Sequence, residues 1–188
     1  MITLKRSIAL VGLMGAGKSS VGRKLAESLG VPFQDSDDEI EKAAGMSIPE
    51  IFETYGEPEF RGVERRVIAR LVQERPQIIS TGGGAFAQDD VRGDIREFGV
   101  SVWLDADIDT LWKRVEDKPG RPLLNTDNPR ETLARLLKIR APAYAQADFT
   151  IRTRSNDNQE NVARKIVKTI RAHDAAHPER AIFKEGAA

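Results

Sequence analysis

The fold of this chain is decided by residues 7–20, which read SIALVGLMGAGKSS. Residues 7–11 form an apolar run of the length that a buried strand of a parallel sheet requires. Residues 12–19 match the pattern G-x-x-x-x-G-K-[ST], and the apolar residues of 18–29 recur at helical spacing until a glycine follows. A strand, a glycine-rich loop and a helix in this order predict a phosphate-binding loop.

Glycines in such a loop let backbone N–H groups converge on phosphate oxygens, and the positive end of the following helix adds to the attraction. We expect Lys18 to reach the β- and γ-phosphates of a nucleoside triphosphate and the Ser19 hydroxyl to bind Mg²⁺. The alternative is a glycine-rich turn without a ligand, which the flanking strand and helix disfavour. The residues predicted to contact the nucleotide here are Gly12, Gly15, Ala16, Gly17, Lys18, Ser19 and Ser20.

Strand and helix patterns alternate along the rest of the chain, which predicts an α/β fold with a parallel sheet covered on both faces. The length of 188 residues suits one domain. We expect that domain to span residues 1–172 and to be followed by a loose tail at 173–188. Further strands are expected at 31–34, 77–80, 100–104 and 149–151, and helices at 36–44, 47–55, 59–74, 107–115, 130–145 and 158–171.

The composition argues against several classes of partner. The formal net charge is zero although 31% of the residues are charged, which disfavours DNA or RNA as a ligand. No apolar run has the length of a membrane span, and the start of the chain does not have the pattern of a signal peptide. The absence of cysteine excludes disulfides and thiolate chemistry. We therefore expect a cytoplasmic monomer that acts on small molecules, without nucleic acid or membrane partners.

A phosphate-binding loop alone predicts only the use of a nucleoside triphosphate. The guanine-reading tetrapeptide N-K-x-D is absent from the chain. The third predicted strand and the residue after it, which read IIST at residues 78–81, lack the acidic residue with which many ATPases and GTPases hold Mg²⁺. Asp35, at the end of the second predicted strand, is the carboxylate that we expect to take this role.

Several further motifs resemble those of the shikimate kinase family, in the family's order and at close to its spacing. The resemblance covers residues 7–171, and one departure is Ser20, where the family often has threonine. It implies a three-layer P-loop kinase fold with a five-stranded parallel sheet, a small substrate-binding region at about 36–64 and a mobile lid at about 116–129. The motifs are Asp35-Ser36-Asp37, Phe60-Arg61-x-x-Glu64, Thr81-Gly82-Gly83-Gly84, Arg121-Pro122-Leu123-Leu124, and Arg140 with Tyr144.

The resemblance also implies an activity, namely transfer of the γ-phosphoryl group of ATP to the 3-hydroxyl of shikimate with Mg²⁺, on the way to chorismate and aromatic amino acids. Lys18, Asp37 and Arg121 are then the expected catalytic residues, with Arg121 carried by the lid to neutralise charge on the transferred group. Arg114 resembles the family residue that stacks on adenine. A cation favoured by a helix C-terminus is the alternative interpretation of Arg114.

The chemistry of the acceptor agrees with these residues. Shikimate is a compact ring with one carboxylate and three hydroxyls. Guanidinium groups pair bidentately with a carboxylate, an aspartate accepts hydrogen bonds from hydroxyls, and glycines after a strand leave backbone N–H groups open to a ligand. Taken singly, the arginines are better explained as solvated helix charges, and the aspartate could be a helix-dipole partner; the family pattern reverses this preference. The expected substrate-binding residues are Asp37, Arg61, Gly82, Gly83, Gly84 and Arg140.

Two other functions stay open at this point. Another small-molecule kinase of the same fold, such as a gluconate kinase, would also recognise a carboxylate and hydroxyls. A non-catalytic nucleotide-binding regulator would be expected to lack some of Lys18, Asp37, Arg121 and Arg140, all of which are present.

Overall fold

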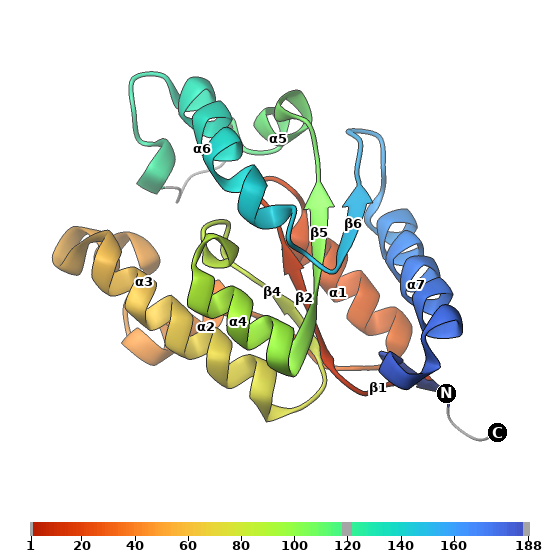
Figure 1. Ribbon diagram of the computed structural model, residues 1–188. Coiled ribbons are helices and arrows are strands. Elements are labelled where there is room, and N and C mark those ends of the chain that lie inside the picture. The colour runs from red at the N-terminus through yellow and green to blue at the C-terminus, as the bar shows by residue number, and fades with distance from the viewer. Residues whose placement is uncertain (1, 118–121, 186–188) are drawn as a thin grey trace.

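The computed structural model describes residues 2–117 and 122–185 and contains a five-stranded parallel sheet in the order β3-β4-β2-β5-β6 (Figure 1). This confirms the predicted α/β class, and every predicted strand lies within two residues of its observed bounds. The strands are β2 (Ser7–Val11), β3 (Phe33–Asp35), β4 (Ile78–Ser80), β5 (Gly99–Asp105) and β6 (Phe149–Arg152).

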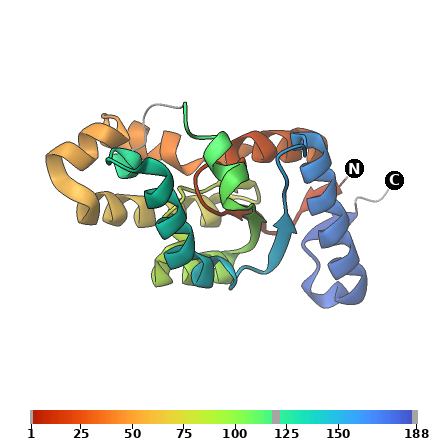
Figure 2. The same ribbon diagram turned by 90° about the horizontal axis from the view of Figure 1, so that it is seen from above.

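Helices cover both faces of the sheet (Figures 1 and 2). On one face α1 (Lys18–Leu29) packs beside α7 (Gln159–Ala176), and on the other α3 (Ile48–Glu74) packs beside α4 (Asp89–Phe98). None of the helices in the described ranges is both long and apolar enough to cross a membrane. The remaining helices are α2 (Ser36–Ala44), α5 (Ile108–Lys113) and α6 (Pro129–Tyr144), with 3₁₀ turns η1 (Ala85–Ala87), η2 (Pro122–Leu124) and η3 (Pro178–Arg180).

The central strand β2 positions the phosphate-binding loop. All five of its residues are buried, and Leu10 lies opposite Ser80 of the neighbouring strand β4. Because β2, β3 and β4 are parallel, their carboxyl ends meet at one edge of the sheet. That edge therefore carries the loop at residues 12–17, Asp35 and the glycines at 82–84, and open α/β sheets bind their ligands there.

The segment labelled α3 consists of two helices that meet at a kink. Helices had been expected at 47–55 and 59–74, and Gly56, with the non-helical φ of 80° and ψ of 173°, interrupts α3 between them as predicted. The predicted capping box at its start is confirmed, because Ser47 N–H donates to Glu50 Oε2 over 2.7 Å and Glu50 N–H donates back to Ser47 Oγ. The helix α4 was not predicted, since its ten residues bury only Val91 and Ile95.

The expectation of a loose tail from residue 173 is wrong for residues 173–185. Helix α7 continues to Ala176, and β7 (Phe183–Glu185) pairs antiparallel with β1 (Ile2–Leu4) in a small second sheet, neither strand of which was predicted. Ile182 and Phe183 are buried, and both donate their backbone N–H groups to the carboxylate of Asp174. This small sheet lies at the edge of the molecule opposite the phosphate-binding loop (Figure 1).

Candidate active site

The phosphate-binding loop requires its glycines. Gly12, Gly15 and Gly17 have φ values of 136°, 84° and 89°, a region that residues with a side chain rarely adopt. A Cβ on Gly12 would lie 2.9 Å from the carbonyl oxygen of Leu104, and one on Gly15 would lie 2.7 Å from that of Leu111. The loop is therefore held tightly against β5 and α5, and it leads directly into the N-terminus of α1 at Lys18.

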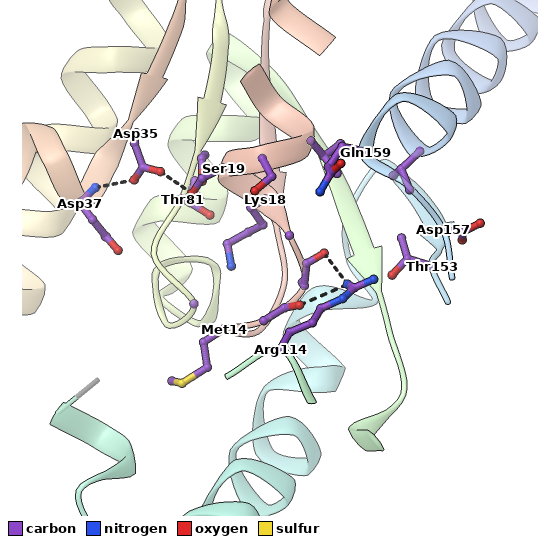
Figure 3. Close-up of a pocket in the computed structure, with 18 of the residues that line it drawn as sticks. Met14, Lys18, Ser19, Asp35, Asp37, Thr81, Arg114, Thr153, Asp157 and Gln159 are labelled. Carbon is purple, nitrogen blue, oxygen red and sulfur yellow. Dashed lines mark hydrogen bonds between the residues drawn. The ribbon is translucent and has the colours of Figure 1, made fainter. Parts of the chain in front are cut away.

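Lys18 is largely buried beneath this loop, with 8% of the residue exposed. Its ammonium group donates to the carbonyl oxygens of Gly12 at 2.8 Å and Leu13 at 3.1 Å. These bonds aim the charge along the inner side of the loop, toward the cavity that the loop borders (Figure 3). The placement suits an ammonium that meets phosphate oxygens, which are stronger acceptors than peptide carbonyls.

The two predicted metal ligands lie in direct contact. The Ser19 hydroxyl donates to Asp35 Oδ2 at 2.6 Å and lies 3.1 Å from the Ser80 hydroxyl (Figure 3). Asp35 Oδ1 accepts the backbone N–H of Asp37 at 3.1 Å, which caps helix α2 and fixes the carboxylate. One carboxylate and one hydroxyl beside a phosphate site fit Mg²⁺, which prefers few protein ligands together with phosphates and waters. Within the described ranges, no group of three or more acidic, histidine or cysteine side chains gathers as a metal cluster.

A cavity of about 500 Å³ extends from the loop toward the segment after β6. Arg114 borders it (Figure 3) and joins its two sides, since its guanidinium donates to the carbonyl oxygens of Gly15 at 3.3 Å and Arg154 at 3.0 Å. The remaining predicted loop residues from Gly15 to Ser20 line this cavity, together with Asp35 and Asp37. The volume and the elongated lining suit a nucleoside triphosphate.

Sequence reasoning placed adenine contacts around residues 152–158 without resolving which residues make them. The far wall of the cavity is formed after β6 and at the start of α7 by Ser155 and by Thr153, Asp157 and Gln159 (Figure 3). These residues match no motif. Their place after the last parallel strand is the only signal that would have indicated them, because ligand-binding loops follow the carboxyl ends of such strands.

A second cavity of about 470 Å³ adjoins the first, and the two share Met14, Asp37 and Gly83 as lining residues. It lies between α2, α3, η2 and α6. Each substrate-binding residue predicted from the sequence borders it: Asp37, Arg61, Gly82, Gly83, Gly84 and Arg140.

The three glycines after β4 are required by close packing and not by their backbone angles, which are not in the left-handed region. A Cβ on Gly82 would lie 2.5 Å from Glu64 Oε1 and 3.0 Å from Asp37 Oδ1, and one on Gly84 would lie 2.5 Å from the Arg61 guanidinium. One expectation is corrected here. The N–H of Gly82 is not open to a ligand, because it donates to the buried hydroxyl of Ser36 at 3.1 Å. The role of Gly82 is therefore to leave room for the Glu64 and Asp37 carboxylates, which a side chain at this position would displace.

Arg61 is fixed by two carboxylates of its own helix. It donates to Glu57 Oε1 at 2.9 Å and to Glu64 Oε2 at 2.7 Å. Glu64 is fully buried, and this burial raises its pKa above the ordinary value, although the positive charges of Arg61 and Arg140 act in the opposite direction. The arginine that would meet a substrate carboxylate is thus held in one orientation, as planar two-point recognition requires.

Three buried polar atoms around the second cavity make no hydrogen bond within the part of the chain that the structure describes. They are Asp37 Oδ1, Glu64 Oε1 and Arg140 Nη1. Buried polar groups are normally satisfied, and an unsatisfied one costs about 1–3 kcal/mol. Two carboxylate oxygens that can accept hydrogen bonds and one guanidinium nitrogen that can donate one thus lie around a single cavity. They indicate a polar ligand that carries hydroxyl groups as donors and a carboxylate as acceptor.

Asp37 is the residue at the junction of the two cavities. Its pKa is raised from 3.8 to about 6, chiefly by burial and also by the negative charges of Asp35 and Glu64, while Lys18 acts in the opposite direction. A carboxylate with a pKa near the working pH is suited to accept a proton from a hydroxyl.

Tyr144, quoted above with Arg140, is fully buried and donates its hydroxyl to the carbonyl oxygen of Gly83, which ties α6 to the glycine segment. Arg121 lies outside the described residues. The adjoining Pro122 and Leu123 of η2 line the second cavity, so the predicted lid reaches it at least there.

A nucleotide cavity on a phosphate-binding loop, continuous with a smaller cavity for a hydroxylated acid, defines the class of the P-loop small-molecule kinases. Residues 14–171 match the family model described as shikimate kinase. The chain belongs to the shikimate kinase family, and this membership makes it an ATP-dependent kinase.

Individual relatives support this family membership. A shikimate kinase of Rhizobium leguminosarum bv. trifolii is 52% identical over 165 residues, which are 88% of this chain and 84% of that protein. A shikimate kinase of Bartonella henselae is 48% identical over 165 residues, 88% of this chain and 78% of that protein.

Solved structures separate the two kinases considered above. The shikimate kinase of Acinetobacter baumannii in complex with shikimate superposes with a TM-score of 0.87 at 41% identity and covers 89% of this chain and 94% of its own. A gluconokinase of Sinorhizobium meliloti reaches a TM-score of 0.62 at 18% identity, a likeness that shows the fold alone. The comparisons favour the shikimate kinase family over the gluconate alternative.

Proposed function

We propose that this chain transfers the γ-phosphoryl group of ATP to the 3-hydroxyl of shikimate, giving shikimate 3-phosphate and ADP. The observation that carries the proposal is the position of Asp37. Its carboxylate borders both cavities, and its Oδ1 is buried without a donor from residues 2–117 or 122–185. A hydroxyl bound to that oxygen from the acceptor cavity would face the end of the nucleotide cavity where the phosphate-binding loop lies.

The nucleotide would occupy the larger cavity, with its phosphates against the backbone N–H groups of the loop and its base near Arg114 and Thr153. Lys18 would contact the β- and γ-phosphates. Ser19 and Asp35 would hold Mg²⁺, whose charge offsets the negative charge that develops on the transferred group. Phosphoryl transfer of this kind depends on positioning and charge neutralisation more than on covalent help from the protein.

The acceptor would bind with its carboxylate on Arg61 and Arg140 and with its hydroxyls toward Asp37 and Glu64. This arrangement supplies a donor to Asp37 Oδ1 and Glu64 Oε1 and an acceptor to Arg140 Nη1, which satisfies all three unpaired buried atoms. Asp37 would orient the reacting hydroxyl and accept its proton as the bond to phosphorus forms.

Residues 36–64 would serve as the substrate-binding region and residues 116–129 as a lid. The lid would bring Arg121 to the phosphates and exclude water that would otherwise hydrolyse ATP. We further propose that the enzyme works as a cytoplasmic monomer in the pathway to chorismate, without nucleic acid or membrane partners. The zero net charge of the chain supports the absence of a nucleic acid partner.

A coupled ADP-release assay with shikimate, gluconate and AMP in parallel tests the proposal. Of the three acceptors, only shikimate should be phosphorylated. The Lys18→Ala substitution should lower kcat with shikimate by on the order of 10²-fold or more. The Lys18→Ala protein must show wild-type secondary structure, so that the loss reflects chemistry and not folding. Faster turnover with gluconate or AMP than with shikimate would overturn the proposed acceptor, and full activity of Lys18→Ala would overturn the proposed catalytic loop.

A further inference from the structure

Gln88 stands at the N-cap of helix α4 and does not cap it. Its side chain makes no hydrogen bond to the first turn of the helix. Serine, threonine, aspartate and asparagine are the residues that stabilise this position, because their short side chains reach the exposed N–H groups. Glutamine is a poor choice for the helix, which raises the question of what its amide does instead.

The Gln88 amide is used in the acceptor site. Its Nε2 donates to Glu64 Oε2 at 2.8 Å, and the same oxygen accepts the Arg61 guanidinium at 2.7 Å. Both donors therefore act on one oxygen of a fully buried carboxylate. The other oxygen, Oε1, has no hydrogen-bond partner among the residues that the structure describes, and it lies close to Gly82 and Asp37.

We propose that Gln88 is a positioning residue for the acceptor: it fixes the Glu64 carboxylate so that Arg61 is aimed at the substrate carboxylate and Glu64 Oε1 at a substrate hydroxyl. The proposal rests on the function proposed above. A neutral amide suits this role, because it restrains Glu64 without adding a positive charge that would compete with Arg61 for the carboxylate. The residue lies outside every motif that the sequence analysis identified.

The position offers a substitution that separates a general loss of stability from a loss of substrate binding. In Gln88→Ser the hydroxyl is short enough to cap α4, and this gain offsets the lost hydrogen bond to the buried Glu64, so the melting temperature should stay within a few degrees of the wild type. The same hydroxyl is too short to reach Glu64. The KM for shikimate should therefore increase on the order of tenfold, while the KM for ATP stays within about twofold.

The matched control is Asp90→Asn, two residues further along the first turn of the same helix. Asp90 is exposed and pairs with Arg65, away from the cavity. This variant should leave both KM values unchanged. Gln88→Leu, which removes the amide and keeps the bulk, should raise the KM for shikimate as Gln88→Ser does.

A double-mutant cycle then tests whether Gln88 acts through Arg61. Adding Gln88→Leu to Arg61→Ala should raise the KM for shikimate by less than about twofold, because the group that Gln88 aims is already absent. Independent multiplication of the two effects would overturn the positioning role, as would an unchanged KM for shikimate in Gln88→Ser. The wild-type enzyme is measured in the same assay, so absence of shikimate turnover there would count against the proposed function and not against Gln88.

Discussion

The hydroxyl of Ser19 donates a hydrogen bond of 2.6 Å to Oδ2 of Asp35, which links the first turn of α1 to the end of β3. The two residues are 16 positions apart in the chain. They come together because β3 ends, and the phosphate-binding loop begins, at the same edge of the sheet. We propose this hydroxyl and this carboxylate as the protein ligands of Mg²⁺.

Asp35→Asn should raise the magnesium concentration that gives half-maximal rate, on the order of tenfold, because an amide oxygen attracts the cation less than a carboxylate. The fold should persist, since asparagine caps α2 as well as aspartate does. The measurement is initial rate against free Mg²⁺ at saturating ATP. Asp38→Asn, at an exposed neighbour, is the control and should not change this value. A shift seen with Asp37→Asn in place of Asp35→Asn would reverse the two roles.

Arg140→Ala and Arg61→Ala should both raise the KM for shikimate by more than tenfold with little change in the KM for ATP. Their stabilities should differ. Arg61→Ala removes the main partner of the buried Glu64 carboxylate and should lower the melting temperature. Arg140→Ala should lower it less, because Arg140 Nη1 bonds to nothing within the described part of the chain.

Lysine at either position should restore binding only in part, because an ammonium cannot make the planar two-point contact. The checks are steady-state kinetics with each substrate varied and thermal unfolding without ligand. An equal rise of both KM values would indicate a general structural role for these arginines.

The raised pKa of Asp37, about 6, predicts opposite effects of pH on stability and on activity. The folded protein holds this proton more tightly than the unfolded chain, so the stability that Asp37 contributes is present below about pH 4 and is lost as pH rises through 6. Asp37→Asn, measured without nucleotide or magnesium, should therefore melt at a higher temperature than the wild type at pH 7.5, and the difference should shrink toward pH 4.5.

Activity should follow the ionised form of Asp37. The kcat/KM for shikimate should fall as pH decreases through about 6, and Asp37→Asn should depress kcat far more than it changes the KM for ATP. A pH profile of the wild type that stays flat between pH 5 and 7 would contradict both the assigned pKa and the role of Asp37 as a proton acceptor.

Phe183→Ala should destabilise the protein by about 2 kcal/mol, because it removes a buried side chain from the edge of the core. The melting temperature should fall by several degrees. Turnover at 25 °C should be nearly unchanged, since the β1–β7 sheet lies at the edge of the molecule opposite the phosphate-binding loop (Figure 1). Lys184→Ala, at the exposed neighbouring position of β7, is the control. An unaltered melting temperature in Phe183→Ala would contradict the packing of the C-terminal strand.

Local pattern predicted the main sheet well, because each of its strands is either an apolar run or follows a helix stop signal. Helix α4 and the strands β1 and β7 were missed for a shared reason. Each buries only one or two large apolar residues, so its periodicity is weak, and β1 and β7 are stable only through pairing with each other across the length of the chain.

The sequence by itself determined the phosphate-binding loop, the parallel α/β class and the identity of most candidate site residues. These follow from local chemistry, namely glycines where a side chain cannot fit, a lysine and a serine at fixed spacing, and apolar runs between them. Tertiary structure alone decided that Asp37 joins two cavities, that Ser36 occupies the N–H of Gly82, and that Gln88 serves Glu64 and not its own helix. Such contacts join residues up to 46 positions apart, and no local pattern records them, because they arise only when parallel strands bring their carboxyl ends to one edge.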